Sequence, residues 1–202
     1  WGGWHAYGSD LDSPYSWEFD FPSGEGYYQF YTLAEDDSGN IEDSPIDPDI
    51  ELGLDRTEAS LDIISPESNM YHDSETVTVS WDSSDILSGI DHYEVRLNSQ
   101  DWVRVEDSQE RMLSQIPEGT VDIDVKAVDI AGNENQTSVS FIIDISDPTV
   151  WIDEPVDGDI YREDLGVNWG GSDEVTSIDH YSIELDGEHI ASGQDTSYQL
   201  DS

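Results

Sequence analysis

The chain has 202 residues, of which 48 are Asp or Glu and only 6 are Lys or Arg, so its formal net charge is −42. This balance excludes a nucleic-acid-binding surface, because such a surface needs clustered basic side chains to meet the phosphates. The absence of cysteine excludes a disulfide framework and a thiolate metal site, and no stretch resembles a membrane-spanning helix.

The acidic excess also predicts the surroundings in which the chain folds. Like charges at this density repel one another in a compact state unless salt or bound cations screen them. Disorder is the alternative interpretation of such charge, but 7 Trp, 10 Tyr and 4 Phe favour a folded protein. The opening WGGWHAYG has neither the basic nor the apolar part of a signal peptide, and we expect the chain to be a piece of a longer protein.

The first predicted segment, residues 1–56, is rich in aromatic side chains. A strand is expected in EGYYQFYT (25–32). The first 31 residues hold more aromatic rings than one inward face of a sheet can bury, so some of them should be exposed. Exposed aromatic rings can bind sugars, and Trp4 and Trp17 are the candidate glycan-binding residues.

The second segment, residues 57–146, alternates apolar and polar side chains with a period of two. The alternation is plainest in TVTVSW (76–81), HYEVRL (92–97), TVDIDVKA (120–127) and TSVSFIID (137–144). This period indicates half-buried strands rather than helices, and the stretches between them are rich in turn residues. About seven short strands in about 90 residues predict an all-β fold, the antiparallel β-sandwich.

The third segment, residues 147–202, begins the same pattern again. WGGSDEVTSIDHY starts at Trp169 and WDSSDILSGIDHY at Trp81, 88 positions earlier, and IDHY is identical in both. Two further pairs of stretches repeat at offsets of 89 and 93 residues, which indicates tandem units. In this phase residues 57–146 form one complete unit, 1–56 the C-terminal half of a unit and 147–202 the N-terminal half. Both tryptophans fall in phase with buried valines and are expected in the core.

The order of these motifs resembles a known family. A strand ending in Trp81, the loop DSSDILSGID, the strand HYEVRL, the turn IPEG and then DIDVKAVDIAGNEN are similar to fibronectin type III and related immunoglobulin-like repeats of microbial, especially archaeal, cell-surface proteins. The resemblance covers the whole chain and implies tandem immunoglobulin-like sandwiches at a cell surface. It also implies a tyrosine at the corner after the IPEG turn, a position held by Val121 in the complete unit and by Tyr28 in the first half unit.

One acidic, glycine-centred phrase occurs twice, as AEDDSGNIE (34–42) and AVDIAGNE (127–134). Between two alternating strands it predicts a hairpin turn. Its glycine would supply the positive φ, and its first aspartate, Asp36 or Asp129, would accept hydrogen bonds from turn amides. The spacing does not match an EF-hand calcium loop.

Metal binding is expected instead at the junctions between units. Only about six residues, DRTEAS and DISDPT, separate the last strand of one unit from the first of the next, which predicts a stiff rod. Carboxylate-rich loops could converge there into the oxygen-rich site that calcium prefers. The candidate ligands are Asp55, Glu58, Asp82, Asp85, Asp144, Asp147, Asp173 and Glu174. The alternative is a solvated acidic surface adapted to salt. A melting temperature that climbs with monovalent salt favours that alternative, and a gain from millimolar calcium alone favours the junction sites.

The remaining motifs give less information about function. Asn135 begins the sequence NQT, a glycosylation sequon, just past a predicted turn. His92 and His180 fall on the polar phase of equivalent strands and are expected at the surface. No Ser-His-Asp arrangement, phosphate loop or zinc motif is found, so an enzyme is not expected.

These observations predict a non-catalytic extracellular structural or adhesive protein, a spacer, surface-layer element, adhesin or fibre, with no cofactor unless it is calcium. Each half unit alone would expose an apolar face and strand edges. Either the chain is cut from a longer array, or its two ends associate, or half units of successive copies complete each other in a head-to-tail filament. The rival functions are an appendage of a secreted hydrolase and a module that binds surface glycans.

Overall fold

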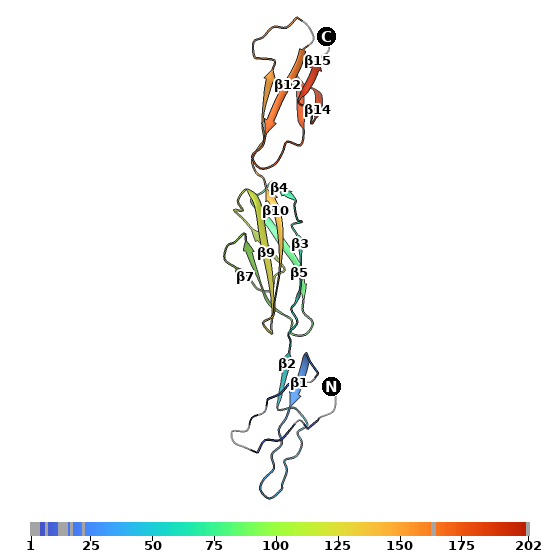
Figure 1. Cartoon of the computed structure of the whole chain (residues 1–202), viewed down its shortest axis with the longest axis vertical. Helices are drawn as coiled ribbons and strands as arrows, with labels where there is room; N and C mark the ends of the chain where they lie inside the picture. The colour runs from blue at the N-terminus through green and yellow to red at the C-terminus, as the bar shows by residue number, and fades with distance from the viewer. Residues whose placement is uncertain are drawn as a thin grey trace.

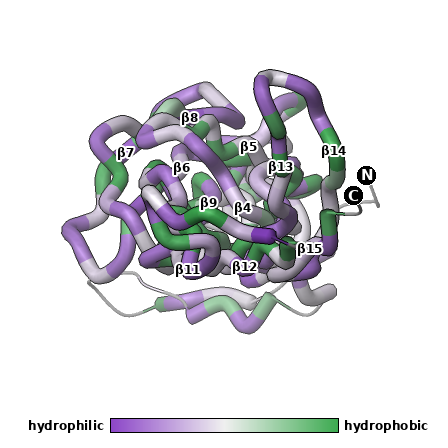
Figure 2. The backbone as a smooth tube through the Cα atoms, turned by 90° about the horizontal axis from the view of Figure 1, so that it is seen from above, coloured by the Kyte–Doolittle hydropathy of each residue, from purple (hydrophilic) through white to green (hydrophobic). Residues whose placement is uncertain are grey.

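The computed structural model describes residues 5–6, 8–11, 16, 18–21, 23–162 and 165–200, and all regular secondary structure in them is extended strand. The strands fall into three groups along one elongated chain, with the N-terminal and C-terminal groups at opposite ends (Figure 1). Seen along the long axis, the groups project onto one another (Figure 2), so they are stacked end to end. The described residues contain no helix that could cross a membrane.

The N-terminal group is an antiparallel hairpin of β1 (Gly26–Phe30) and β2 (Ile50–Leu54). Phe19 packs edge-to-face against Phe21, Tyr28 and Phe30, with ring centroids 5.2, 5.5 and 4.8 Å apart. The Tyr28 hydroxyl donates a hydrogen bond to the carbonyl of Gly24, which confirms the predicted tyrosine corner in this half unit. Part of the aromatic excess therefore forms a small local cluster.

The central group is a sandwich of two sheets. Antiparallel pairing gives the three-stranded sheet β3-β5-β8, and the five-stranded sheet β4-β10-β9-β6-β7 is antiparallel except for the short pair β4 and β10. This arrangement confirms the predicted all-β, immunoglobulin-like sandwich. The strands are β3 (Ser60–Ser65), β4 (Tyr71–His72), β5 (Val77–Ser84), β6 (Ile90–Leu97), β7 (Val103–Val105), β8 (Glu110–Leu113), β9 (Gly119–Asp129) and β10 (Glu134–Ile143).

The apolar phase of these strands fills the space between the two sheets. Trp81 is 3% exposed and packs edge-to-face on Tyr93 at 5.3 Å, as predicted for a core residue. Burial of each Val, Leu, Ile or Phe side chain contributes about 1.5–3 kcal/mol. The other buried apolar residues are Ala59, Leu61, Val77, Val79, Val95, Ile116, Val121, Ile123, Val125, Ala127, Val139, Phe141 and Ile143.

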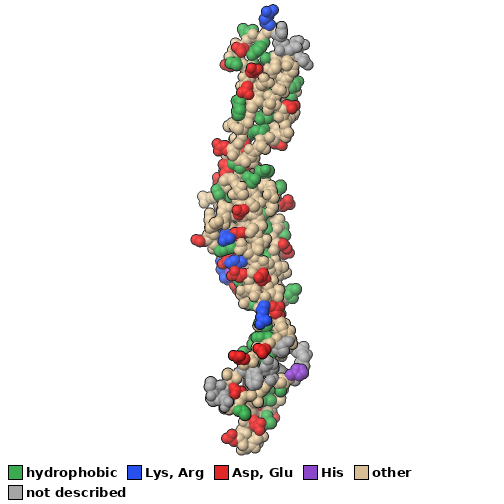
Figure 3. All heavy atoms as spheres, viewed as in Figure 1, with side chains coloured by type: hydrophobic (Ala, Val, Ile, Leu, Met, Phe, Trp, Pro, Cys, Tyr) green, Lys and Arg blue, Asp and Glu red, His purple; other side chains and the backbone are tan. Residues whose placement is uncertain are grey.

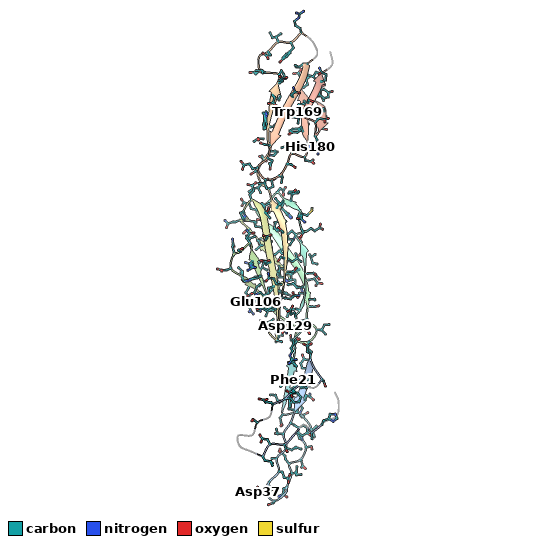
Figure 4. All side chains as sticks on the ribbon, in the orientation of Figure 1. Phe21, Asp37, Glu106, Asp129, Trp169 and His180 are labelled. Atoms are coloured by element: carbon teal, nitrogen blue, oxygen red, sulfur yellow. The ribbon has the colours of Figure 1, made fainter. Side chains whose placement is uncertain are left out.

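The C-terminal group repeats the first half of the sandwich with one face open. Its sheets are β11-β12-β15 and β13-β14. Val150 and Ile152 are 67% and 65% exposed, whereas Leu61, the central counterpart of Val150, is 7% exposed. Trp169, labelled in Figure 4, is only half-buried, so the prediction that it lies in the core is confirmed only in part. The strands are β11 (Thr149–Glu154), β12 (Leu165–Ser172), β13 (Tyr181–Leu185), β14 (Glu188–Gly193) and β15 (Ser197–Leu200).

The two equivalent histidines differ in exposure. The side chain of His180 is 63% exposed, as expected, but that of His92 is 11% exposed, so the surface prediction is wrong for His92. His92 pairs with Val128 of β9 and its Nδ1 lies 2.6 Å from a carboxylate oxygen of Asp91, whereas His180 precedes β13 and belongs to no sheet.

Candidate metal centre

The connection between β2 and β3 is held against the end of the central unit. The Asn133 side-chain amide, in the turn between β9 and β10, lies 3.4 Å from the carbonyl oxygens of both Asp55 and Thr57 and donates to them. Asn135 donates to the carbonyl of Ala59 at 2.8 Å. The carbonyls of alternate residues in this extended connection are thus bound by the turn and the start of β10, which fixes Asp55 relative to the central unit.

Three carboxylates meet at this first junction. Asp55 lies in the connection, Asp85 in the loop after β5 and Asp129 at the end of β9, and one oxygen of each lies within 4.8 Å of the others. Asp129 is 1% exposed, and Figure 4 places it at the end of the central unit that faces the N-terminal group. We call these three residues the junction triad.

Backbone amides hold two members of the triad. One oxygen of Asp85 accepts the N–H groups of Leu87, Ser88 and Gly89 at 3.1, 2.8 and 2.7 Å. These hydrogen bonds, that from Gly89 above all, lower the pKa of Asp85, so it is a carboxylate at neutral pH. The Ser88 N–H also lies 3.0 Å from Asp55 Oδ2, which links the connection directly to the loop.

The repeated turn orients the third member. Asp129 accepts the backbone and side-chain N–H groups of Asn133, both at 2.8 Å, and Gly132 has a φ of 91°. Asp36 and Asn40 make the same pair of contacts at 2.9 and 2.8 Å. The predicted hairpin turn is therefore confirmed in both copies, and in the second copy the same aspartate also belongs to the triad.

The spacing of the triad suits a divalent cation. Calcium binds oxygen at 2.3–2.6 Å, so ligands on opposite sides of the ion lie about 5 Å apart. Within the described residues no ion pair with a basic side chain involves the triad; Arg96, Arg104 and Lys126 pair instead with carboxylates around the five-stranded sheet. On the face shown in Figure 3 the basic side chains gather mainly on the central unit, while acidic ones occur along the whole length.

The second junction brings together three of the other six predicted ligands. Asp147, Asp173 and Glu174 line a cavity of about 350 Å³, together with hydroxyl side chains. Asp173 accepts the backbone N–H of Thr176 at 2.7 Å. Hydrogen bonds from the backbone amides of Thr176 and Val175 are the main cause of the lowered pKa of Asp173.

This second cluster corresponds to part of the first. Asp144 and Asp173 occupy the positions of Asp55 and Asp85 one repeat later: the first of each pair lies in a connection between units, and the second lies in the loop after β5 or β12. The counterpart of Asp129 would fall beyond residue 202. The described residues therefore show two of the three equivalent carboxylates here.

Sequence reasoning found two members of the triad and missed the third. Glu58 and Asp82 do not join it: both are exposed, and Asp82 lies opposite Asp62 in the β3–β5 register. Asp129 was missed because the turn already accounted for it. The available signal was strand direction, since β5 and β9 both run toward the first junction and the loops that follow them lie at one end.

The remaining predicted sites are placed as follows. Trp4 and Trp17 lie outside the described residues. Asn135 is half-buried and its side-chain nitrogen already donates to Ala59. A glycan on the side-chain nitrogen of Asn135 would leave that nitrogen only one N–H. The hydrogen bond to Ala59 therefore counts against glycosylation of Asn135, which stays a prediction.

Acid is expected to loosen the second junction. The Glu118 carboxylate accepts the N–H groups of Ile145 and Ser146 at 3.2 and 3.0 Å, and hydrogen bonding by the side chain of Ser146, with smaller contributions from these two amides, lowers the pKa of Glu118. Because the folded-state pKa is lowered, this stabilisation is complete above the ordinary glutamate value of about 4.3 and is lost as the pH falls through the folded value. NMR titration of the two amides should give a midpoint below about 4.3, and Glu118→Gln should abolish the transition. A midpoint above that value would contradict the assignment.

Comparisons with known proteins give structural likenesses only. No family model matches the chain, and no curated protein matches it. The fibronectin(III)-like modules of CbhA from Clostridium thermocellum match with a TM-score of 0.43 and 16% identity, over 71% of this chain and 79% of that one. The extracellular domain of a hybrid two-component system, BT3049 from B. thetaiotaomicron, matches with a TM-score of 0.32 and 13% identity, over 55% of this chain and 19% of that one. At these scores the fold assignment rests on the strand pairing described above.

Proposed function

We propose that this chain is a non-catalytic extracellular structural protein, a stiff rod of immunoglobulin-like units that is straightened by cations bound between them, with calcium the ion that fits the ligands. One complete unit spans residues 57–146, flanked by half units at 1–56 and 147–202. The negative charge and the resemblance to microbial surface repeats support a cell-surface spacer, surface-layer element or adhesin of a halophilic, archaeal cell.

The main support for a stiff rod is a contact that recurs at both junctions. Glu25 accepts the N–H of Arg56 and the hydroxyl of Thr57, each at 2.7 Å. One repeat later Glu118 accepts the N–H groups of Ile145 and Ser146. A connection bound by the preceding unit in the same way twice cannot swivel freely, and this supports a fixed geometry between units.

The junction triad supports the part of the proposal that places a cation between units. A carboxylate that is 1% exposed beside two others costs free energy through lost hydration and like-charge repulsion. An ion bound by all three would offset that cost. Because its ligands come from the connection and from two loops of the central unit, such an ion would also lock one unit against the next.

Small-angle X-ray scattering with matched thermal melts tests both parts of the proposal. In millimolar calcium we expect the scattering of an extended, rigid particle and a raised melting temperature. In chelator at low salt we expect a broader distribution of dimensions and a lower melting temperature. Compact scattering in every buffer would overturn the rod. A melting temperature that follows molar NaCl and ignores calcium would overturn the cation.

A second candidate function is head-to-tail assembly of copies. It is favoured by the open face of the C-terminal group, where Val150 and Ile152 are 67% and 65% exposed. The β1–β2 hairpin corresponds by repeat to β9 and β10, which cover that face in the central unit, so a second copy could supply it. Sedimentation over a wide concentration range should then show growing species, and a monomer at every concentration would rule the assembly out.

A further inference from the structure

The outer face of the sheet β11-β12-β15 carries a tryptophan seated on a glycine. Trp151 lies opposite Gly170 in the β11–β12 register. A Cβ at Gly170 would stand only 2.8, 2.9 and 3.0 Å from Cζ2, Cε2 and Nε1 of the indole. The ring therefore rests against the bare backbone of β12, in space that any other residue would fill.

This tryptophan is not a core residue. It is 47% exposed, and it points away from the apolar face that holds Val150 and Ile152, because successive side chains of a strand alternate between faces. At the equivalent register position of the central unit the pair is Asp62 and Asp82. The central unit therefore forms its sandwich with an Asp–Asp pair where the C-terminal group has the Trp–Gly pair, so the packing of the sandwich does not require the tryptophan.

The surroundings of the ring are polar. Thr149 lies two residues before Trp151 and shares its face, and after a bulge at Asp153 the strand returns Glu154 to that face, opposite Asn168. On the neighbouring strand the amide of Asn168 lies 3.3 Å from Glu154 Oε2. A large exposed ring with hydrogen-bonding groups on a flat sheet offers a stacking surface and a polar rim.

Charge narrows the class of ligand. A chain with a net charge of −42 repels anionic polymers. A neutral sugar is not repelled, and a pyranose with equatorial hydroxyl groups presents a face of axial C–H groups that suits the negative face of an indole ring.

We propose that Trp151, seated on Gly170, is a binding platform for neutral, gluco-configured oligosaccharides. One ring with a polar rim gives weak binding, with a Kd of about 1 mM. The site shares no residue with the junction triad at the first junction, so sugar binding does not require the cation proposed there.

The test follows the indole N–H resonance of Trp151, assigned by its loss in Trp151→Phe, during titration with cellohexaose. We expect saturable shifts of this resonance and at least tenfold weaker binding, about 10 mM or more, in Trp151→Ala. Gly170→Ala should weaken binding equally while leaving the fold intact, because its methyl displaces only the indole. Trp102→Phe, which alters a half-buried tryptophan on the other unit, should bind like the parent.

Two results would overturn the proposal. One is the absence of any shift of the Trp151 resonance at about 10 mM cellohexaose. The other is equal binding of an oligogalacturonate, which would show that a neutral ligand is not selected. Neither result bears on the rod or its cation, since those are tested by scattering and calcium.

Discussion

The Trp81→Ala variant is expected to lose about 3–5 kcal/mol of unfolding free energy, and Trp169→Ala about half of that or less. The two residues begin the same motif, so their local sequences are matched. Trp81 is 3% exposed between two sheets, with Tyr93 at 5.3 Å. Trp169 lies on the open face and its contact with Tyr181 is longer, at 6.2 Å. Urea unfolding followed by hydrogen exchange of each unit measures the two losses separately.

The comparison of Trp81→Ala with Trp169→Ala also tests whether the apolar face of the C-terminal group is uncovered. Equal losses at dilute concentration would contradict the description of Trp169 as half-buried, because they would require a second layer over it. Losses for Trp169→Ala that grow with protein concentration would instead point to completion of the C-terminal group by another copy. Matched Ile63→Val and Ile152→Val variants should show the same order, the first costing about 0.5–1.5 kcal/mol and the second less.

The Asp129→Asn variant is expected to abolish the stabilisation that calcium confers. Calcium at a hundredfold excess over its Kd would stabilise the parent by about 2.7 kcal/mol. Asparagine keeps the size of the side chain but removes a charge from the triad, and its NH₂ group faces another donor on Asn133. In chelator the lost hydrogen bond from Asn133 is opposed by weaker repulsion among the triad carboxylates, so we expect the free energy of unfolding to change by no more than about 1 kcal/mol. Thermal melts in calcium and in chelator give both quantities.

The chain offers its own control for this prediction. Asp36→Asn alters the same aspartate of the same turn, with Asn40 in place of Asn133, but Asp36 is not a member of the triad. It should therefore leave the calcium gain intact. If both variants retained the full gain, the ion would bind elsewhere. If both lost it, the effect would come from the turn rather than from the triad.

Much of the fold could be predicted because its determinants are local. The period of two in β5, β6, β9 and β10 reports which side chains face the core, and that depends only on residues two apart. The turns at Gly39 and Gly132 were predictable for the same reason, since a positive φ is a property of one residue. The tyrosine corner of Tyr28 was implied by the resemblance to fibronectin type III and related repeats. The repeat of about 90 residues then extended each local inference to the neighbouring units.

The tertiary structure alone decided which of the many carboxylates meet. Asp55, Asp85 and Asp129 come from separate segments, and nothing in their local sequences distinguishes them from Glu58 and Asp82. Their convergence depends on how two sheets pack and on which ends of strands share a junction, which are properties of the assembled sandwich.

Some features of this protein are thus determined by local sequence pattern and others by tertiary packing. By itself the sequence determined an acidic, cysteine-free, all-β chain of tandem units, with turns and strands at identifiable positions, because backbone conformation and strand periodicity depend on near neighbours. Only the tertiary structure decided that a buried turn aspartate meets two other carboxylates at the first junction and that Trp151 rests on Gly170, because both depend on residues brought together across strands and loops.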